Sequence, residues 1–191
     1  ALASWERFKM VRPATETKMR ILKAARSLYS THGCDNTSLD DIITASGITK
    51  DAFYHYFKSK ESLCEILLEE VMADYQQLAE SIDTTGEPIE QLRGVIGKLT
   101  ELNASGQWVN CRLILLLSAS NHEAHPKIHV KLQEFWQRQQ KFYEDLLTKC
   151  QLKGQLNSQI APKAQAQLLM SAMAGAIILN KVNPGEKTMD N

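Results

Sequence analysis

Aromatic side chains with polar tips and charged side chains crowd one short stretch, Thr49 to Phe57. Phe53 and Phe57 are four residues apart, so a helix would turn both toward a core. The outward positions would then carry hydroxyl, imidazole, ammonium and carboxylate groups, at Thr49, Lys50, Asp51, Tyr54, His55 and Tyr56. Such groups can contact phosphates and base edges in a DNA groove. An aromatic-rich core helix is the alternative interpretation.

The helix expected at Thr49 to Phe57 needs a second helix to hold it in place, and the residues before Thr49 predict that second helix. Thr37 and Ser38 are N-cap residue types and are followed by two aspartates, which favours a helix beginning near Leu39. Gly47 can take the left-handed conformation that ends a helix, and Thr49 can cap the next one. The pattern predicts two short helices joined by a tight turn.

The stretch from Arg20 to Leu63 resembles the DNA-binding domain of the tetracycline-repressor (TetR) family. The positions that carry the resemblance are Ile21, Leu22, Ala25, Leu28, Tyr29, Gly33, Thr37, Ile42, Ser46, Gly47, Ile48, Thr49, Phe53, Tyr54, Phe57, Lys60, Glu61 and Leu63. About a quarter of the chain is covered, and the rest is similar in length and helical character only. The resemblance implies a transcriptional regulator, most simply a repressor that an effector releases from a palindromic operator in double-stranded DNA.

Position by position, the resemblance also implies how the chain would contact DNA. Phosphate contacts are expected from Thr37, Tyr54, Tyr56 and Lys60, and base contacts from Ser38, Thr49, Lys50, Asp51 and His55. A carboxylate in a groove can accept a hydrogen bond from the amino group of cytosine. Asp51 therefore predicts an unusual base preference at its position.

Charge is unevenly distributed along the chain, although the formal total is zero. The first 60 residues carry ten Lys and Arg against six Asp and Glu, and the remainder has the opposite excess. A basic head on an acidic body suits a chain that meets a polyanion at one end, and chance is the alternative. Arg12 belongs to an N-terminal arm that would enter a minor groove or remain a solvated tail.

Every remaining apolar pattern has the helical period, and none alternates as a strand would. Further helices are expected from Thr15 or Thr17 to His32, from Ser59 to about Ile82, from Ile89 to Leu102, from Asn110 through Leu117, from Pro126 to Cys150, and from Pro162 to about Lys181. The predicted fold is all-α. An N-terminal three-helix helix-turn-helix DNA-binding domain, residues 1–58, precedes a C-terminal helical ligand-binding and dimerisation domain, residues 59–191. The last two long helices would pair with a second copy as a four-helix bundle, which gives a homodimer.

Aromatic and sulfur-containing side chains in the body are candidates for an effector pocket, with core packing as the alternative. They are Trp108, Cys111, Leu115, Trp136, Tyr143, Met170 and Met173. If Asn110 caps its helix, Cys111 lies in the first turn, where the helix dipole favours a thiolate. Cys111 would then be a sensing thiol. The alternative is a small apolar filler.

Other chemistry is weakly represented. His122, Glu123, His125 and His129 suggest a metal site, but a helix starting at Pro126 would keep them from converging. A glycine-rich phosphate loop, a G-x-S-x-G motif and paired carboxylates in an apolar segment are missing from the sequence. We therefore expect no enzyme, no catalytic residues, no metal and no cofactor.

Composition points to the cytoplasm. The four cysteines are far apart and are typical of reduced thiols. The apolar runs are shorter than the roughly 18 residues of a membrane span, and a signal peptide is not recognised. The function from another class that we retain is a helical architectural or partner-binding protein without a transcriptional role.

Overall fold

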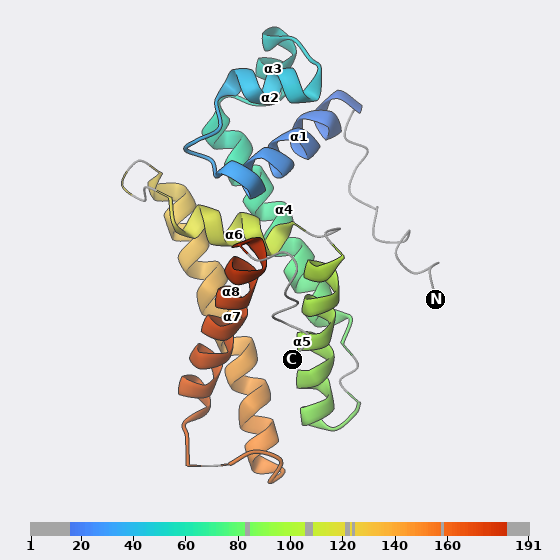
Figure 1. Cartoon of the computed structure of the whole chain (residues 1–191), viewed down its shortest axis with the longest axis vertical. Helices are drawn as coiled ribbons and strands as arrows, with labels where there is room; N and C mark the ends of the chain where they lie inside the picture. Colours follow the sequence, from blue (N-terminus) through green and yellow to red (C-terminus); the bar gives the residue numbers. More distant parts are fainter. Residues whose placement is uncertain are drawn as a thin grey trace.

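The structure is a computed structural model that describes residues 16–82, 85–105, 109–120, 123, 125–157 and 159–182, and these residues form helices but no strand (Figure 1). The helices are α1 (Glu16–His32), α2 (Leu39–Ser46), α3 (Lys50–Tyr56), α4 (Lys60–Glu80), α5 (Pro88–Ala104), α6 (Asn110–Ser118), α7 (Pro126–Leu152) and α8 (Pro162–Val182). The predicted all-α fold is confirmed. Within the described ranges, no helix is both long enough and apolar enough to cross a bilayer.

Local cap chemistry explains why the boundaries of the short helices were predictable. The Ser38 hydroxyl accepts from the Asp41 amide at 3.1 Å, and the Asp41 carboxylate accepts from the Ser38 amide at 2.8 Å. This capping box begins α2. Gly47 ends α2 with φ 61°, in the left-handed region, and the Thr49 hydroxyl accepts from the Ala52 amide at 3.2 Å to begin α3.

Two expected caps differ from the prediction. Val109 occupies the cap position of α6, and Asn110 is the first helical residue, with its amide used in contacts to other helices. His125 precedes α7 as expected, yet its side chain makes no capping hydrogen bond. In both cases long-range polar partners take the side chain that a local cap would have used.

The helices form a head and a longer body. In Figure 1, α1, α2 and α3 lie at one end, and α4 runs from this head into the body formed by α5, α7 and α8. α6 lies just beneath the head, where it packs along α1. In the body, α7 packs against both α5 and α8.

The hydrophobic core is continuous from head to body. One cluster joins Ile21 and Phe53 of the head to Leu67 of α4, Leu117 of α6 and Phe135 of α7. A second cluster fills the body between α5, α6, α7 and α8. Because the first cluster crosses from one unit to the other, the division after residue 58 remains a prediction.

Two buried tyrosines predict a loss of stability at high pH. Tyr29 is 0% exposed and Tyr143 is 3% exposed, and burial raises the pKa of both phenols. Above pH ~10 the unfolded chain loses these protons while the folded chain keeps them, so each tyrosine lowers the free energy of unfolding by up to about 1.4 kcal/mol per pH unit. Chemical denaturation from about pH 9 to pH 11 should reveal this slope.

Tyr143→Phe tests the assignment, because it removes one titrating group from the unfolded chain while keeping the ring. The slope of stability against pH should become shallower by the contribution of one proton. An unchanged slope would mean that Tyr143 ionises as readily in the folded protein as in the unfolded one.

Candidate nucleic-acid interface and internal cavity

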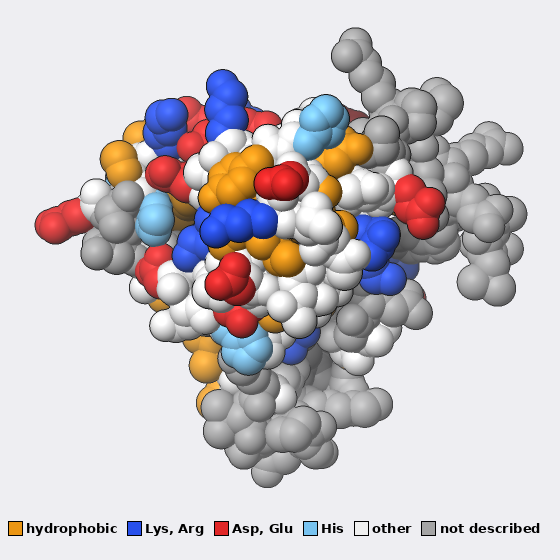
Figure 2. All heavy atoms as spheres, turned by 90° about the horizontal axis from the view of Figure 1, so that it is seen from above, with side chains coloured by type: hydrophobic (Ala, Val, Ile, Leu, Met, Phe, Trp, Pro, Cys, Tyr) orange, Lys and Arg blue, Asp and Glu red, His pale blue; other side chains and the backbone are white. Residues whose placement is uncertain are grey.

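The outward face of α3 is formed by the side chains that the sequence singled out. Lys50, Asp51, Tyr54 and His55 are exposed, with Tyr54 at 50%, whereas Phe53 on the opposite side is fully buried. Figure 2 looks down on this end of the molecule and shows basic, acidic and histidine side chains intermingled with hydrophobic ones. The interface therefore offers hydrogen-bonding variety rather than a uniformly positive surface.

Arg20 of α1 holds the turn that orients α3. Its Nη2 donates to the carbonyl oxygens of Ser46 at 2.6 Å and Gly47 at 2.8 Å. These carbonyls lie at the C-terminal end of α2, where unpaired oxygens and the helix dipole favour a cation. A Cβ added to Gly47 would lie 2.8 Å from the same Nη2, so the turn and the guanidinium are closely fitted.

The sequence did not identify Arg20 as a functional residue. A basic residue on a predicted helix has the same pattern whether it is solvated or paired with a distant turn. The only available signal was its position at the start of the resemblance.

Two residues with side-chain hydroxyls, Ser38 and Thr49, begin α2 and α3 and are exposed. They serve as the N-caps of these two helices. Each hydroxyl already accepts a hydrogen bond within its own helix, and the Ser38 hydroxyl also donates to Asp41 Oδ2 at 2.7 Å. Their proposed contacts to bases would have to use the remaining hydrogen-bonding capacity of the oxygen.

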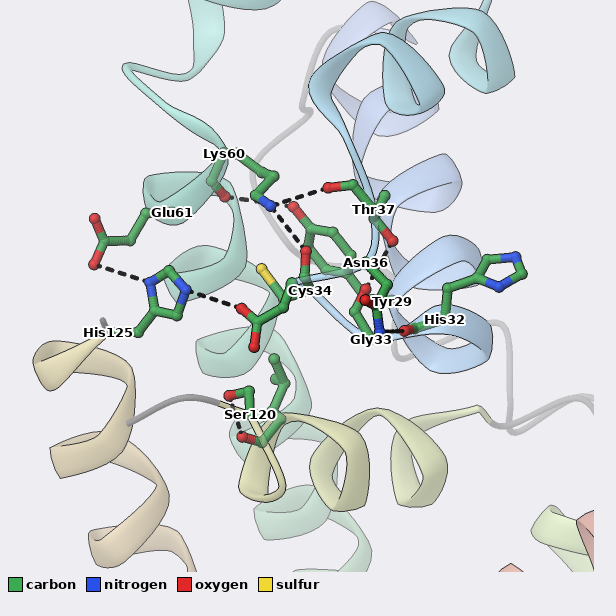
Figure 3. Close-up of polar contacts among 12 residues, drawn as sticks. Tyr29, His32, Gly33, Cys34, Asn36, Thr37, Lys60, Glu61, Ser120 and His125 are labelled. Atoms are coloured by element: carbon green, nitrogen blue, oxygen red, sulfur yellow. Dashed lines mark hydrogen bonds and ion pairs between the residues drawn. The ribbon is translucent and has the colours of Figure 1, made fainter. Parts of the chain in front are cut away.

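Thr37 and Lys60 lie differently from the phosphate contacts that were expected of them. Thr37 is 2% exposed, and its hydroxyl donates to the carbonyl of Gly33 at 2.7 Å. Lys60 Nζ donates to the carbonyls of Cys34 at 2.9 Å and Thr37 at 3.0 Å, as Figure 3 shows. Both groups hold the turn between α1 and α2, which argues for structural roles. The ring of Tyr56 is partly buried against the same core.

His125 links the start of α7 to the head. Its Nε2 lies 3.0 Å from Asp35 Oδ1, and its Nδ1 lies 3.7 Å from Glu61 Oε1 (Figure 3). Among the residues that the structure describes, no three His, Cys, Asp or Glu side chains are grouped for a metal ion. His122 lies outside the described residues.

Cys111 does not have the environment of an activated thiol. It is buried at 5% exposure, the Tyr75 hydroxyl donates to its Sγ at 3.0 Å, and burial raises its pKa. A raised pKa suppresses the nucleophilic thiolate. Although Cys111 still lies in the first turn of α6, desolvation outweighs the hydrogen bond from Tyr75. Its environment therefore favours the alternative of a small apolar filler, and the sensing thiol stays a prediction.

Cys34 has the opposite environment. A hydrogen bond with Cys64 and the nearby Lys60 ammonium lower its pKa to about 7, against the opposing effect of burial. The residue is only 1% exposed, so this thiol lies in the core.

Six of the predicted effector residues line one cavity. Cys111, Leu115, Trp136, Tyr143, Met170 and Met173 surround it, together with Tyr75, Leu99, Ile114, Phe135, Gln139, Ala174 and Ile177. Its volume is about 50 Å³, and it lies where the two apolar clusters meet. Trp108, the seventh predicted residue, lies outside the described residues.

The cavity wall is uncharged. Its polar atoms are few: the Tyr75 hydroxyl is engaged with Cys111, the Trp136 indole donates to Ser118 Oγ at 2.8 Å, and Gln139 and Tyr143 add an amide and a phenol. A wall of this kind accepts an apolar molecule with one or two hydrogen-bonding groups. It would strongly disfavour a bare charge.

Comparison with known proteins gives consistent matches. Residues 21–66 match the family described as "Bacterial regulatory proteins, tetR family". The HTH-type transcriptional repressor DhaR of Mycobacterium sp. (strain GP1) is 22% identical over 92% of this chain and 88% of its own length.

Solved structures share the fold over nearly the whole chain. The regulatory protein TetR from Rhodobacter sphaeroides superimposes with a TM-score of 0.80 at 21% identity, covering 92% of this chain and 94% of its own. The transcriptional regulator FadR from Bacillus subtilis, solved in complex with stearoyl-CoA, has a TM-score of 0.72 at 22% identity over 91% of each chain.

The inward position of Lys60 predicts that its loss affects stability. Lys60→Gln removes two charge-assisted hydrogen bonds to the turn before α2, and should cost about 1–3 kcal/mol in the free energy of unfolding. Lys58→Gln is the matched control, since Lys58 is exposed two residues away. Urea denaturation of both variants measures the difference. Equal free energies of unfolding for the two variants would mean that the two hydrogen bonds of Lys60 do not stabilise the head, and would favour the phosphate contact expected from the sequence.

Proposed function

Because this chain belongs to the TetR family of bacterial transcriptional regulators, we propose that it represses transcription by binding an operator through α3 until a small uncharged molecule enters the cavity. The observation that carries the proposal is the outward face of α3, held by Arg20 at the tip of the head. As the sequence predicted, the role is regulatory rather than catalytic.

The proposed reading of DNA divides the outward groups by chemistry. Lys50 can donate to guanine, Asp51 can accept from cytosine, and His55 can do either according to its tautomer. Tyr54, whose ring is half exposed, is suited to a phosphate contact. Thr49 directly precedes Lys50, and Ser38, the exposed N-cap of α2, completes the proposed surface.

A second copy of the chain is the proposed partner of α8. Large apolar side chains stand exposed on this helix, with Leu168 at 71%, Ile178 at 55% and Leu179 at 50%. A two-fold axis lets one such surface cover its own copy, and α7 and α8 of two chains would form a four-helix bundle. Two heads related by this axis would meet a palindromic operator, with half-sites about one helical turn of DNA apart or a multiple of it.

The size of the cavity supports a compact effector. Its 50 Å³ is well below the ~150 Å³ of a cavity that holds benzene, so a ligand must push the walls apart. Met170 and Met173 of α8 are unbranched and can rearrange. Binding would then favour a conformer with differently spaced heads, and the operator would be released by a population shift. FadR was solved with the far larger stearoyl-CoA, which a space of about 50 Å³ does not accommodate without extensive rearrangement.

Selection from random duplex DNA, followed by footprinting, tests DNA recognition. We expect protection of a palindrome, and Lys50→Gln should cost about 1–3 kcal/mol and relax the preference at one base position. Lys163→Gln removes the same charge from α8, in the body, and should leave sequence preference unchanged. Failure to enrich any sequence would support the architectural alternative instead.

Sedimentation velocity tests the proposed dimer. Leu168→Asp places a charge on the exposed face of α8 and should shift the wild-type dimer to monomer, because an unpaired buried charge is costly. Met19→Asp is the control, since Met19 is 53% exposed on α1, outside the two helices of the proposed bundle. A dimer that survives the α8 substitution would place the interface elsewhere.

A further inference from the structure

Arg26 of α1 joins three helices at the junction of head and body. Its Nη1 donates to Asn110 Oδ1 on α6 at 2.9 Å and to Asp74 Oδ2 on α4 at 3.2 Å, and its Nη2 donates to Glu70 Oε2 at 2.8 Å. Asn110 Nδ2 also donates to Asp74 Oδ2 at 2.8 Å. We call these four side chains the Arg26 network.

The network is sensitive to small movements of α6. Asn110 is fully buried, and both ends of its amide are used, one toward Arg26 and the other toward Asp74. A shift of its helix would leave the buried amide of Asn110 without partners and would remove one hydrogen bond from the Arg26 guanidinium, which is unfavourable. Hydrogen-bonded networks of this kind have discrete arrangements rather than a continuous range.

The adjacent residue on each helix faces the cavity. Tyr75 follows Asp74 on α4, and Cys111 follows Asn110 on α6; both line the cavity, and the Tyr75 hydroxyl donates to Cys111 Sγ at 3.0 Å. Two bridges therefore connect α4 to α6, one residue apart. Since neighbouring helical residues are only about 1.5 Å apart along the axis, a change in one bridge displaces the other.

We propose that the Arg26 network couples the cavity to the DNA-binding head, with Arg26 as a positioning residue, an inference that rests on the proposed repressor function. A molecule that enters the cavity separates Tyr75 from Cys111 and moves the first turn of α6 away from α4. Asn110 then loses Arg26 or Asp74, and α1 is released from that side.

The same helix carries the effect to α3. Arg20 lies six residues before Arg26 on α1 and holds the carbonyls of Ser46 and Gly47 at the turn that orients α3. A change in the position of α1 is therefore a change in the position of the DNA-reading helix. By contrast, the Lys131–Glu69 pair joins α7 to α4 without involving α1 or the cavity wall.

A double-mutant cycle in the full-length protein tests this coupling. Cys111→Met fills the cavity from its wall and serves as the probe, so no effector has to be identified. With Arg26 present, it should weaken binding to the selected operator by about tenfold or more. In an Arg26→Gln background the loss should shrink to less than about twofold, because the connection is already broken. A Lys131→Gln background should retain the whole loss.

A second variant and a second measurement make the outcome decisive. If Cys111→Met does not fold by circular dichroism, Tyr75→Phe removes only the hydroxyl of the cavity-facing bridge and should weaken binding by about fivefold, again only with Arg26 present. Hydrogen exchange of the α1 amides, measured without DNA, should accelerate on cavity filling in the Arg26 chain and stay unchanged in Arg26→Gln.

The two proposals can fail separately. Operator binding that falls equally in the Arg26 and Arg26→Gln backgrounds overturns the coupling and leaves the repressor function intact. A wild-type chain that selects no DNA sequence overturns the repressor function. In that case the exchange of α1 still decides whether Arg26 senses the cavity, and equal changes in both backgrounds reject it.

Discussion

The short helices of the head depend for their stability on apolar contacts with other helices. α2 has 8 residues and α3 has 7, lengths at which an isolated helix is unstable in water. Phe53 and Phe57 fill this requirement by packing with α1 and α4 in a cluster that continues to α6 and α7. Because residues of the body stabilise the head, the side chains on the outward side of α3 are not needed for packing the core. The exposed side chains of this helix, such as Lys50 and Asp51, are therefore available for the proposed contacts with DNA.

Apolar packing fixes where α1 lies, and its two arginines determine what it is attached to. Arg20 meets backbone oxygens at the end of α2, a contact that depends on no other side chain. Arg26 meets two carboxylates and one buried amide, a contact that changes when any partner helix moves. Arg20 thus joins α1 to the turn before α3, and Arg26 joins α1 to α4 and α6 through the Arg26 network. This division is what a helix needs in order to transmit a movement.

Features governed by neighbours in sequence were predictable, and features governed by distant partners were not. Ser38, Gly47 and Thr49 act within three or four residues, so their helix ends followed from residue type. The cavity residues of α7 and α8 followed from residue type, since Trp136, Tyr143, Met170 and Met173 were singled out as aromatic and sulfur-containing side chains of the body, and all four line the cavity. Asn110 looked like a cap because nothing in the sequence shows Arg26, 84 residues away, as its partner. Lys60 and Cys111 were assigned outward or reactive roles for the same reason, since their burial depends on tertiary contacts.

The mixed charge of the reading surface has a consequence for how the protein searches a genome. On α3 the cation Lys50 is followed directly by the anion Asp51. The ammonium group of Lys60 donates to two backbone carbonyls inside the head. The groups of α3 itself would therefore neutralise few phosphates, so the contacts made by this helix would release few condensed counterions. The affinity that α3 contributes for arbitrary DNA would be low and would change little with salt. Salt-dependent attraction to arbitrary DNA would come instead from exposed lysines elsewhere in the head, such as Lys23 and Lys58, and α3 would add specificity to it.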